Sequence, residues 1–100
     1  MIRHVVLCRL KEGVAGDDPR VAAVTQEFAK LGPLLSEAAR PLGWETHDGI
    51  GTTAIAAQLA MVCDFPDVAA LEAYQADPEH RKVAGRLREV FDLSSADYVH

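Results

Sequence analysis

Two stretches of this chain predict β-strands that are apolar on both faces. Residues 2–10 are rich in valine and leucine, and apolar side chains occupy both odd and even positions through the middle of the stretch. Residues 53–64 are almost continuously apolar and join a glycine-containing turn to a helix start. A sheet that is covered on one side alternates apolar and polar residues. Strands of this kind therefore predict a sheet with apolar cover on both faces.

The length of the chain limits where that cover can come from. One hundred residues make a single domain with one core, here residues 1–100, and the helices that cover one face leave no element for the other. A second copy packed sheet to sheet would supply it. Burying roughly several hundred Å² of apolar side chains at ~25 cal/mol per Å² would drive the association. We therefore expect a homodimer formed through the sheet face.

The remaining segments complete an alternation of strands and helices. A first helix begins at Asp18 and Pro19, and its apolar stripe runs to residue 35, interrupted at Gly32 and Pro33. It is followed by a short helical segment (36–40), a short strand (44–48), the long strand (53–64), two helices divided by Pro78 and a last strand (94–100). The order β-α-β-β-α-β predicts an α+β, ferredoxin-like fold, a four-stranded antiparallel sheet with its helices on one face.

Charge and composition disfavour several kinds of partner. A net charge of −5 argues against nucleic acid and anionic membranes, because both require clustered lysine and arginine. The basic side chains of the last helix alternate with acidic ones and are interpreted as a solvated face; they are Arg81, Lys82, Arg86 and Arg88. No apolar run approaches the ~20 residues of a membrane span, and the N-terminal segment does not resemble a signal peptide. We expect a cytoplasmic protein.

The two cysteines and His47 could suggest a disulfide or a metal site, but their spacing favours neither. Cys8 and Cys63 fall near opposite ends of two neighbouring antiparallel strands, roughly 15–20 Å apart at ~3.4 Å per residue, which is beyond disulfide reach. His47 has Glu45 and Asp48 beside it but no second cluster of ligands. We therefore predict buried free thiols and no metal ion.

Residues 71–80, LEAYQADPEH, are the strongest candidate for a chemical site. Tyr74 and His80 are six residues apart, so on a straight helix the second side chain would be rotated about 120° from the first. Pro78 removes a backbone donor and moves Asp77 away from helical angles, so the chain turns between them. The turn would bring a phenol and an imidazole to the same space, a combination suited to acid–base chemistry.

Three short motifs in register resemble the stress-responsive A/B barrel domain (Dabb) family. They are the opening Met1-Ile2-Arg3-His4-Val5-Val6-Leu7, the segment Tyr74-x-x-x-Pro78-x-His80 followed by Val83, and the closing Asp97-Tyr98. The resemblance spans essentially the whole chain and implies a dimeric α+β barrel. Many family members have no assigned activity, and some plant members are stress-induced. One, olivetolic acid cyclase, closes a linear tetraketide by intramolecular aldol condensation without metal or organic cofactor.

The resemblance to that cyclase implies roles for particular residues. Its catalytic pair corresponds to His80, which would remove the acidic proton, and Tyr74, which would steady the base or the carbonyl. A histidine beside its pocket corresponds to His4, which would shape the cavity. We expect substrate to contact an apolar cavity between helices and sheet, formed by His4, Val6, Cys8, Phe28, Leu59, Met61 and Val83.

The chain departs from the cyclase at positions that shape the pocket. Asp77 replaces a histidine before the motif proline, and Leu59 stands where a second strand histidine aligns. Bulky aromatic residues on the first helix of the cyclase align with smaller side chains here, which are Val21, Ala22 and Thr25. These differences leave the acid–base pair intact and predict a wider, differently shaped pocket.

The leading hypothesis is a homodimer whose cavity binds a small apolar, carbonyl-bearing ligand. Its chemistry would be cofactor-free acid–base catalysis, such as polyketide-type aldol cyclisation. The same residues also have structural interpretations, since Tyr74 can pack a helix onto the sheet and His4 can be satisfied by a carboxylate partner. Two alternatives therefore remain. One is a non-catalytic stress-response or assembly protein with a vestigial cavity, and the other is a cofactor-independent oxygenase.

Overall fold

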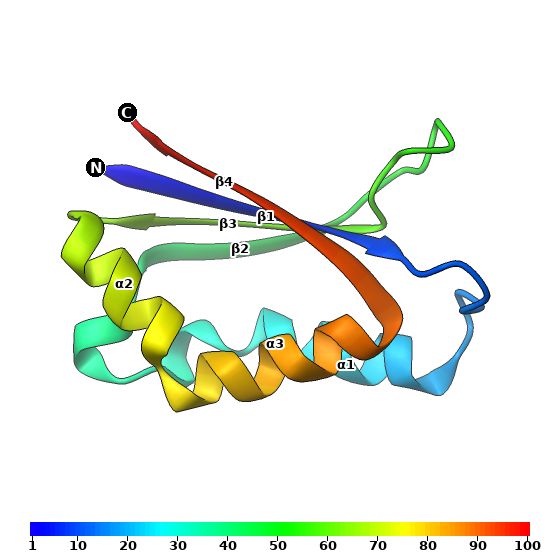
Figure 1. The fold of residues 1–100 in the computed structure, drawn as a ribbon, viewed down its shortest axis with the longest axis horizontal. Coiled ribbons are helices and arrows are strands. Elements are labelled where there is room, and N and C mark those ends of the chain that lie inside the picture. Colours follow the sequence, from blue (N-terminus) through cyan, green and yellow to red (C-terminus); the bar gives the residue numbers. More distant parts are fainter.

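The computed structural model describes residues 1–100 as one antiparallel sheet with every helix on the same side (Figure 1). The strands are β1 (Ile2–Leu10), β2 (Leu42–Asp48), β3 (Leu59–Phe65) and β4 (Phe91–Val99), in the spatial order β2-β3-β1-β4. The helices are α1 (Pro19–Ala29), α2 (Val68–Ala76) and α3 (Pro78–Val90), with two 3₁₀ turns, η1 (Gly32–Leu34) and η2 (Glu37–Ala39). The predicted ferredoxin-like α+β fold is confirmed. None of the helices combines the length and the apolar character needed to cross a membrane.

Aspartate side chains begin all three α-helices at the positions that the sequence indicates. Asp18, Asp67 and Asp77 each accept a hydrogen bond from an amide of the following turn, at 2.9 Å in every case. Pro19 and Pro78 occupy the first helical positions, where a missing amide hydrogen costs nothing. The caps satisfy amides that a helix start leaves without partners. Asp77 therefore ends α2 and begins α3.

Strand pairing places the two cysteines at opposite ends of the central strands. β1 pairs with β3 over seven positions and with β4 over nine. Cys8 lies opposite Leu59, and Cys63 lies opposite His4. Both thiols are free and buried, as predicted. Burial raises the pKa of each to about 12.

The helix-facing side of the sheet forms the core, and Trp44 joins it to α1. Trp44 stacks edge-to-face on Phe28, with ring centroids 5.5 Å apart, and its indole nitrogen donates to the Phe28 carbonyl at 3.0 Å. A Cβ at Gly32 would lie 2.8 Å from Cγ of Trp44, so only glycine fits where α1 gives way to η1. The strand that carries Trp44 begins at Leu42, two residues earlier than predicted, with a bulge between them.

The opposite face of the sheet has no cover within the chain (Figure 1). The pairs Val5–Val62 and Leu7–Ala60 lie at its centre. Leu7 is 43% exposed, and the other three side chains are half-buried. The sheet is therefore apolar on both faces, as the sequence indicates, and one of those faces meets no helix.

Two strand boundaries differ from the prediction. The third strand begins at Leu59 rather than at residue 53, and the preceding residues form a loop that projects beyond the sheet (Figure 1, green). β2 ends at Asp48, opposite Leu59. Before β3 only Gln58 still bonds to a neighbouring strand, donating its amide to the Cys8 carbonyl, whereas residues 53–57 have no strand partner, and Ile55 is 79% exposed. The last strand begins at Phe91, directly after α3, rather than at residue 94, because pairing with β1 continues as far as Leu10.

Candidate functional site

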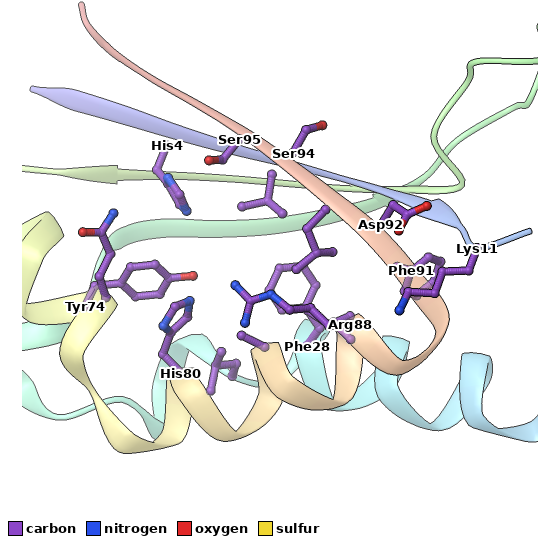
Figure 2. Close-up of a pocket in the computed structure, with 16 residues that line it drawn as sticks. His4, Lys11, Phe28, Tyr74, His80, Arg88, Phe91, Asp92, Ser94 and Ser95 are labelled. Atoms are coloured by element: carbon purple, nitrogen blue, oxygen red, sulfur yellow. The ribbon is translucent and has the colours of Figure 1, made fainter.

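A cavity of about 590 Å³ lies between α3, β4 and the helix-facing side of β1 (Figure 2). Its apolar lining comes mainly from Val6, Phe28, Leu31, Leu87 and Phe91. Its polar lining includes His4, Tyr74, Gln75, His80, Arg88, Ser94 and Ser95, with Lys11 and Asp92 toward one end. The space is therefore a pocket in which apolar and polar side chains contribute about equally, with polar groups placed to orient a small molecule.

Tyr74 and His80 come together as the helix break predicts. Tyr74 lies on α2 and His80 on α3, and their ring centroids are 4.1 Å apart. The Tyr74 side chain is buried, yet its hydroxyl makes no hydrogen bond within the chain and points into the cavity (Figure 2). Burial raises the pKa of Tyr74 well above its usual range. The phenol therefore stays protonated and is a hydrogen-bond donor rather than a base.

His80 has a buried ring nitrogen with no partner. Its Nδ1 is inaccessible to solvent and forms no hydrogen bond, although the Gln75 carbonyl is close enough to act on the ring. Burial lowers the pKa of His80, and the positive charge of Arg88 acts in the same direction. The imidazole is therefore neutral at pH 7. Because Nδ1 is out of reach of solvent, Nε2, which makes no hydrogen bond within the chain, is the nitrogen available to a bound molecule.

His4 is held by a carboxylate across the sheet. Its Nδ1 forms a hydrogen bond with the carboxylate of Asp97, which faces it on the neighbouring strand β4. His4 itself is buried, and about a third of the Asp97 side chain is exposed. The imidazole ring points from β1 toward Tyr74, with centroids 5.3 Å apart (Figure 2). Because Nδ1 is occupied by Asp97, Nε2 is the nitrogen left to face the cavity.

Asp77, which replaces the histidine of the cyclase, holds the backbone together rather than lining the cavity. Besides capping α3, its carboxylate accepts bonds from the hydroxyl of Ser36 at 2.8 Å and from the Ser36 amide at 3.2 Å. Burial acts to raise the pKa of Asp77, but the bonds from Ser36 and from the amides of Glu79 and His80 outweigh it and lower that pKa. The carboxylate fixes the turn that places His80.

Only part of the predicted substrate-binding set reaches the cavity. His4, Val6 and Phe28 line it, together with the predicted catalytic pair. The others are buried in the core and do not line it; they are Cys8, Leu59, Met61 and Val83. The sheet order explains Leu59 and Met61, because the cavity opens between α3 and β4, whereas β3 lies on the far side of β1. Side chains of β3 are packed beneath the helices instead.

Several lining residues were not identified from the sequence. Arg88 was interpreted as part of a solvated face, but its side chain lines the cavity. Asp97 was noted only as part of a family motif, not as the partner of His4. The sequence does contain a signal for Asp97. If β4 starts at Phe91, strand alternation places the polar residues Ser95 and Asp97 on the inward-facing side. Polar residues at core-facing positions indicate a partner or a site.

The His47 cluster lies away from the cavity. His47 is on β2, its Nε2 is 3.6 Å from a Glu45 carboxylate oxygen, and both side chains are about two-thirds exposed. No three histidine, cysteine, aspartate or glutamate side chains come together in a geometry that could hold a metal ion. The cluster therefore provides no metal-binding geometry.

The chain also matches a family model described as Stress responsive A/B Barrel Domain, Dabb, over residues 2–100. It belongs to the Dabb family. A relative from Streptomyces coelicolor, the uncharacterized protein SCO4036, is 35% identical over 98 residues, which is 98% of each chain. The family resemblance predicted from the three motifs is confirmed.

Two solved structures show the same fold at low sequence identity. A dimeric ferredoxin-like protein of unknown function from Thermobifida fusca superposes on this Dabb protein with a TM-score of 0.78 at 24% identity, covering 99% of this chain and 90% of that one. The hydroxynitrile lyase from Passiflora edulis gives a TM-score of 0.74 at 16% identity, covering 99% and 92%. At these identities the likeness extends to the fold alone.

Proposed function

We propose that this Dabb protein binds a small apolar ligand bearing a carbonyl group and catalyses cofactor-free proton transfer on it, as an aldol-type cyclisation requires. The observation that carries the proposal is a cavity in which polar groups without protein partners lie among apolar side chains. They are the Tyr74 hydroxyl and His80 Nε2, beside an imidazole at His4 that Asp97 holds in place. Burying an unpartnered polar group is costly, and a ligand that bonds to these groups would remove that cost.

The two histidines suit different roles. A carboxylate on one imidazole nitrogen stabilises the charge that forms when the other nitrogen accepts a proton. His4 has that carboxylate in Asp97, whereas His80 has none and its pKa is lowered by burial. We therefore assign the base to His4, with Tyr74 and neutral His80 as hydrogen-bonding groups for the carbonyl. The assignment of His80 as the base, predicted from the sequence, is the alternative.

The reaction needs only these groups. Nε2 of His4 takes a proton from the carbon beside the carbonyl, and the C–H electrons move to the carbonyl oxygen. The phenol of Tyr74 donates a hydrogen bond to the enolate that forms. In a cyclisation the enolate carbon then attacks a second carbonyl of the same molecule, and the imidazolium of His4 returns its proton to the resulting alkoxide.

Hydrogen–deuterium exchange on an aryl ketone tests this proposal. Acetophenone in D₂O at pH 7.5 exchanges its methyl hydrogens when a base removes them, and the rate is followed by proton NMR. We expect the protein to accelerate exchange, and His4→Ala and Tyr74→Phe to lower that acceleration by at least about a hundredfold and about tenfold, respectively. Lys82→Gln, on the solvent side of α3, is the control.

The variants also separate the two histidines. If His4 is the base, Asp97→Asn lowers the rate about as much as His4→Ala, while His80→Gln has a smaller effect. The reverse order would return the role to His80. If the wild-type protein does not accelerate exchange above the protein-free rate, proton transfer is not its activity, and the non-catalytic alternative is favoured.

We also propose that a second copy covers the free face of the sheet. The bare apolar centre formed by Val5, Leu7, Ala60 and Val62 supports this, as does the description of the Thermobifida fusca protein as dimeric. Sedimentation velocity at micromolar concentration should give the mass of two chains. Leu7→Glu should give the mass of one, whereas Val68→Glu, which is exposed on α2, should not. A wild-type monomer would show that the proposal is wrong.

A further inference from the structure

Arg88 is an unpaired cation inside the cavity. It lies in the last turn of α3 and makes no hydrogen bond or ion pair within the chain. Arg86, two residues earlier on the same helix, pairs with Glu27, and Arg3 and Arg20 have carboxylate partners as well. Arg9 also has no partner but lies outside the cavity, so Arg88 is the unpaired guanidinium among the lining residues, and its donors are all available.

The side chain of Arg88 extends along the cavity toward the reactive groups, although part of it is exposed to solvent. Helix side chains point back toward the N-terminus, and eight residues of α-helix are about 12 Å long, so Arg88 reaches back along α3 in the direction of His80. Figure 2 shows its guanidinium within the cavity, directed toward Tyr74 and His80. Its positive charge contributes to the lowered pKa of His80, which agrees with this placement.

We propose that Arg88 binds a carboxylate on the ligand, so that the cavity takes carbonyl compounds that carry an acid group in preference to neutral ones. This inference rests on the proposed function and adds the ligand class to it. A planar guanidinium matches a carboxylate through two parallel hydrogen bonds. The ligand would place its acid on Arg88 and its carbonyl near the Tyr74 hydroxyl.

The charges around the cavity favour a single negative charge over a phosphate. Arg88 is the one guanidinium that lines the cavity, and His80 is neutral at pH 7. Asp92 and Lys11 lie toward the other end of the cavity (Figure 2), where Asp92 would repel a second negative charge. Arg88 is therefore the cation at the Tyr74 and His80 end of the cavity, and it balances one carboxylate there.

Binding of a matched pair of compounds tests the proposal. We would titrate 4-oxo-4-phenylbutanoate, which has a ketone and a carboxylate, and its neutral amide by isothermal calorimetry at pH 7.5, with wild type, Arg88→Gln, Arg88→Lys and Lys82→Gln. A charge-assisted bidentate contact should make the acid bind the wild type at least about tenfold more tightly than the amide. Arg88→Gln should abolish that preference without weakening the amide, and Arg88→Lys should restore part of it.

The controls separate the possible failures. Lys82→Gln removes one positive charge from the same helix outside the cavity, so retention of the preference there assigns it to Arg88 rather than to net charge. Equal binding of acid and amide by the wild type would overturn the role of Arg88 and leave the proposed function standing. Binding of neither compound would overturn both. Displacement of the acid by an equal concentration of inorganic phosphate would overturn the carboxylate in favour of a phosphate group.

Discussion

The turn at Asp77 and the cavity beside it differ in whether their polar groups have hydrogen-bond partners within the chain. Asp77 accepts hydrogen bonds from Ser36 and Glu79, and it is buried with its hydrogen-bonding capacity in use. Three residues later, His80 has a buried nitrogen with no partner. One region contributes stability, because its polar groups are satisfied within the chain. The other retains bonding capacity, which only a bound molecule would use.

Loss of the Asp77 carboxylate should have the largest effect on stability. Asp77→Ala removes a helix cap and leaves the Ser36 amide and hydroxyl without an acceptor, which should lower the free energy of unfolding by about 2–3 kcal/mol. Asp67→Ala removes a cap with one bond in an exposed position and should cost about 1 kcal/mol. Urea denaturation of both variants measures the difference. If both variants lose the same free energy of unfolding, the Ser36 contacts do not contribute to stability.

The pH dependence of stability should show the same contrast in two separate windows. Burial lowers the pKa of His80, so the unfolded chain binds this proton first, and stability falls as the pH drops below about 6.5. The pKa of Asp77 is also lowered, so its contribution is lost only at lower pH, beginning near the ordinary aspartate value of about 4.

Thermal melts of two variants between pH 8 and pH 3 would separate these windows. His80→Gln should flatten the melting temperature between pH 7 and pH 5, relative to wild type. Asp77→Asn should leave that range unchanged and reduce the loss below pH 4. A His80→Gln profile parallel to the wild type would contradict the burial of a neutral imidazole.

Removing an unpartnered group from the cavity should change stability least. Tyr74→Phe deletes a hydroxyl that bonds to nothing in the chain, so the free energy of unfolding should change by no more than about 0.5 kcal/mol. The same substitution should weaken binding of the ketone probes. A loss of more than about 1 kcal/mol would show that the hydroxyl has a structural partner and would weaken the contrast between the two regions.

Much of the fold could be predicted because the local signals are strong. Apolar strands, aspartate caps followed by proline, and the break at Pro78 are encoded in adjacent residues, so helix starts at Asp18 and Asp67 agree with the structure. The meeting of Tyr74 and His80 followed from the same local break. The error at residues 53–58 has a physical reason: their composition suits a strand, but β2 ends opposite Leu59 and only Gln58 bonds to β1.

The cavity was harder to predict because it depends on contacts between distant segments. Asp97 faces His4 only through the register of β1 and β4, which are separated by most of the chain. Arg88 looks like any other charge on an amphipathic helix until the direction of its side chain is known. The predicted contacts Leu59 and Met61 have the right apolar character but lie on β3, away from the opening.

The two buried cysteines also determine how the core responds to reagents. Only a thiolate reacts readily with alkylating agents or peroxide, and burial holds Cys8 and Cys63 in the thiol form at neutral pH. In the folded molecule both sulfurs are shielded beneath the helices, next to the walls of the cavity but not within it. Their rate of alkylation therefore reports how often the helix layer separates from the sheet, so the two thiols are a built-in probe of core opening.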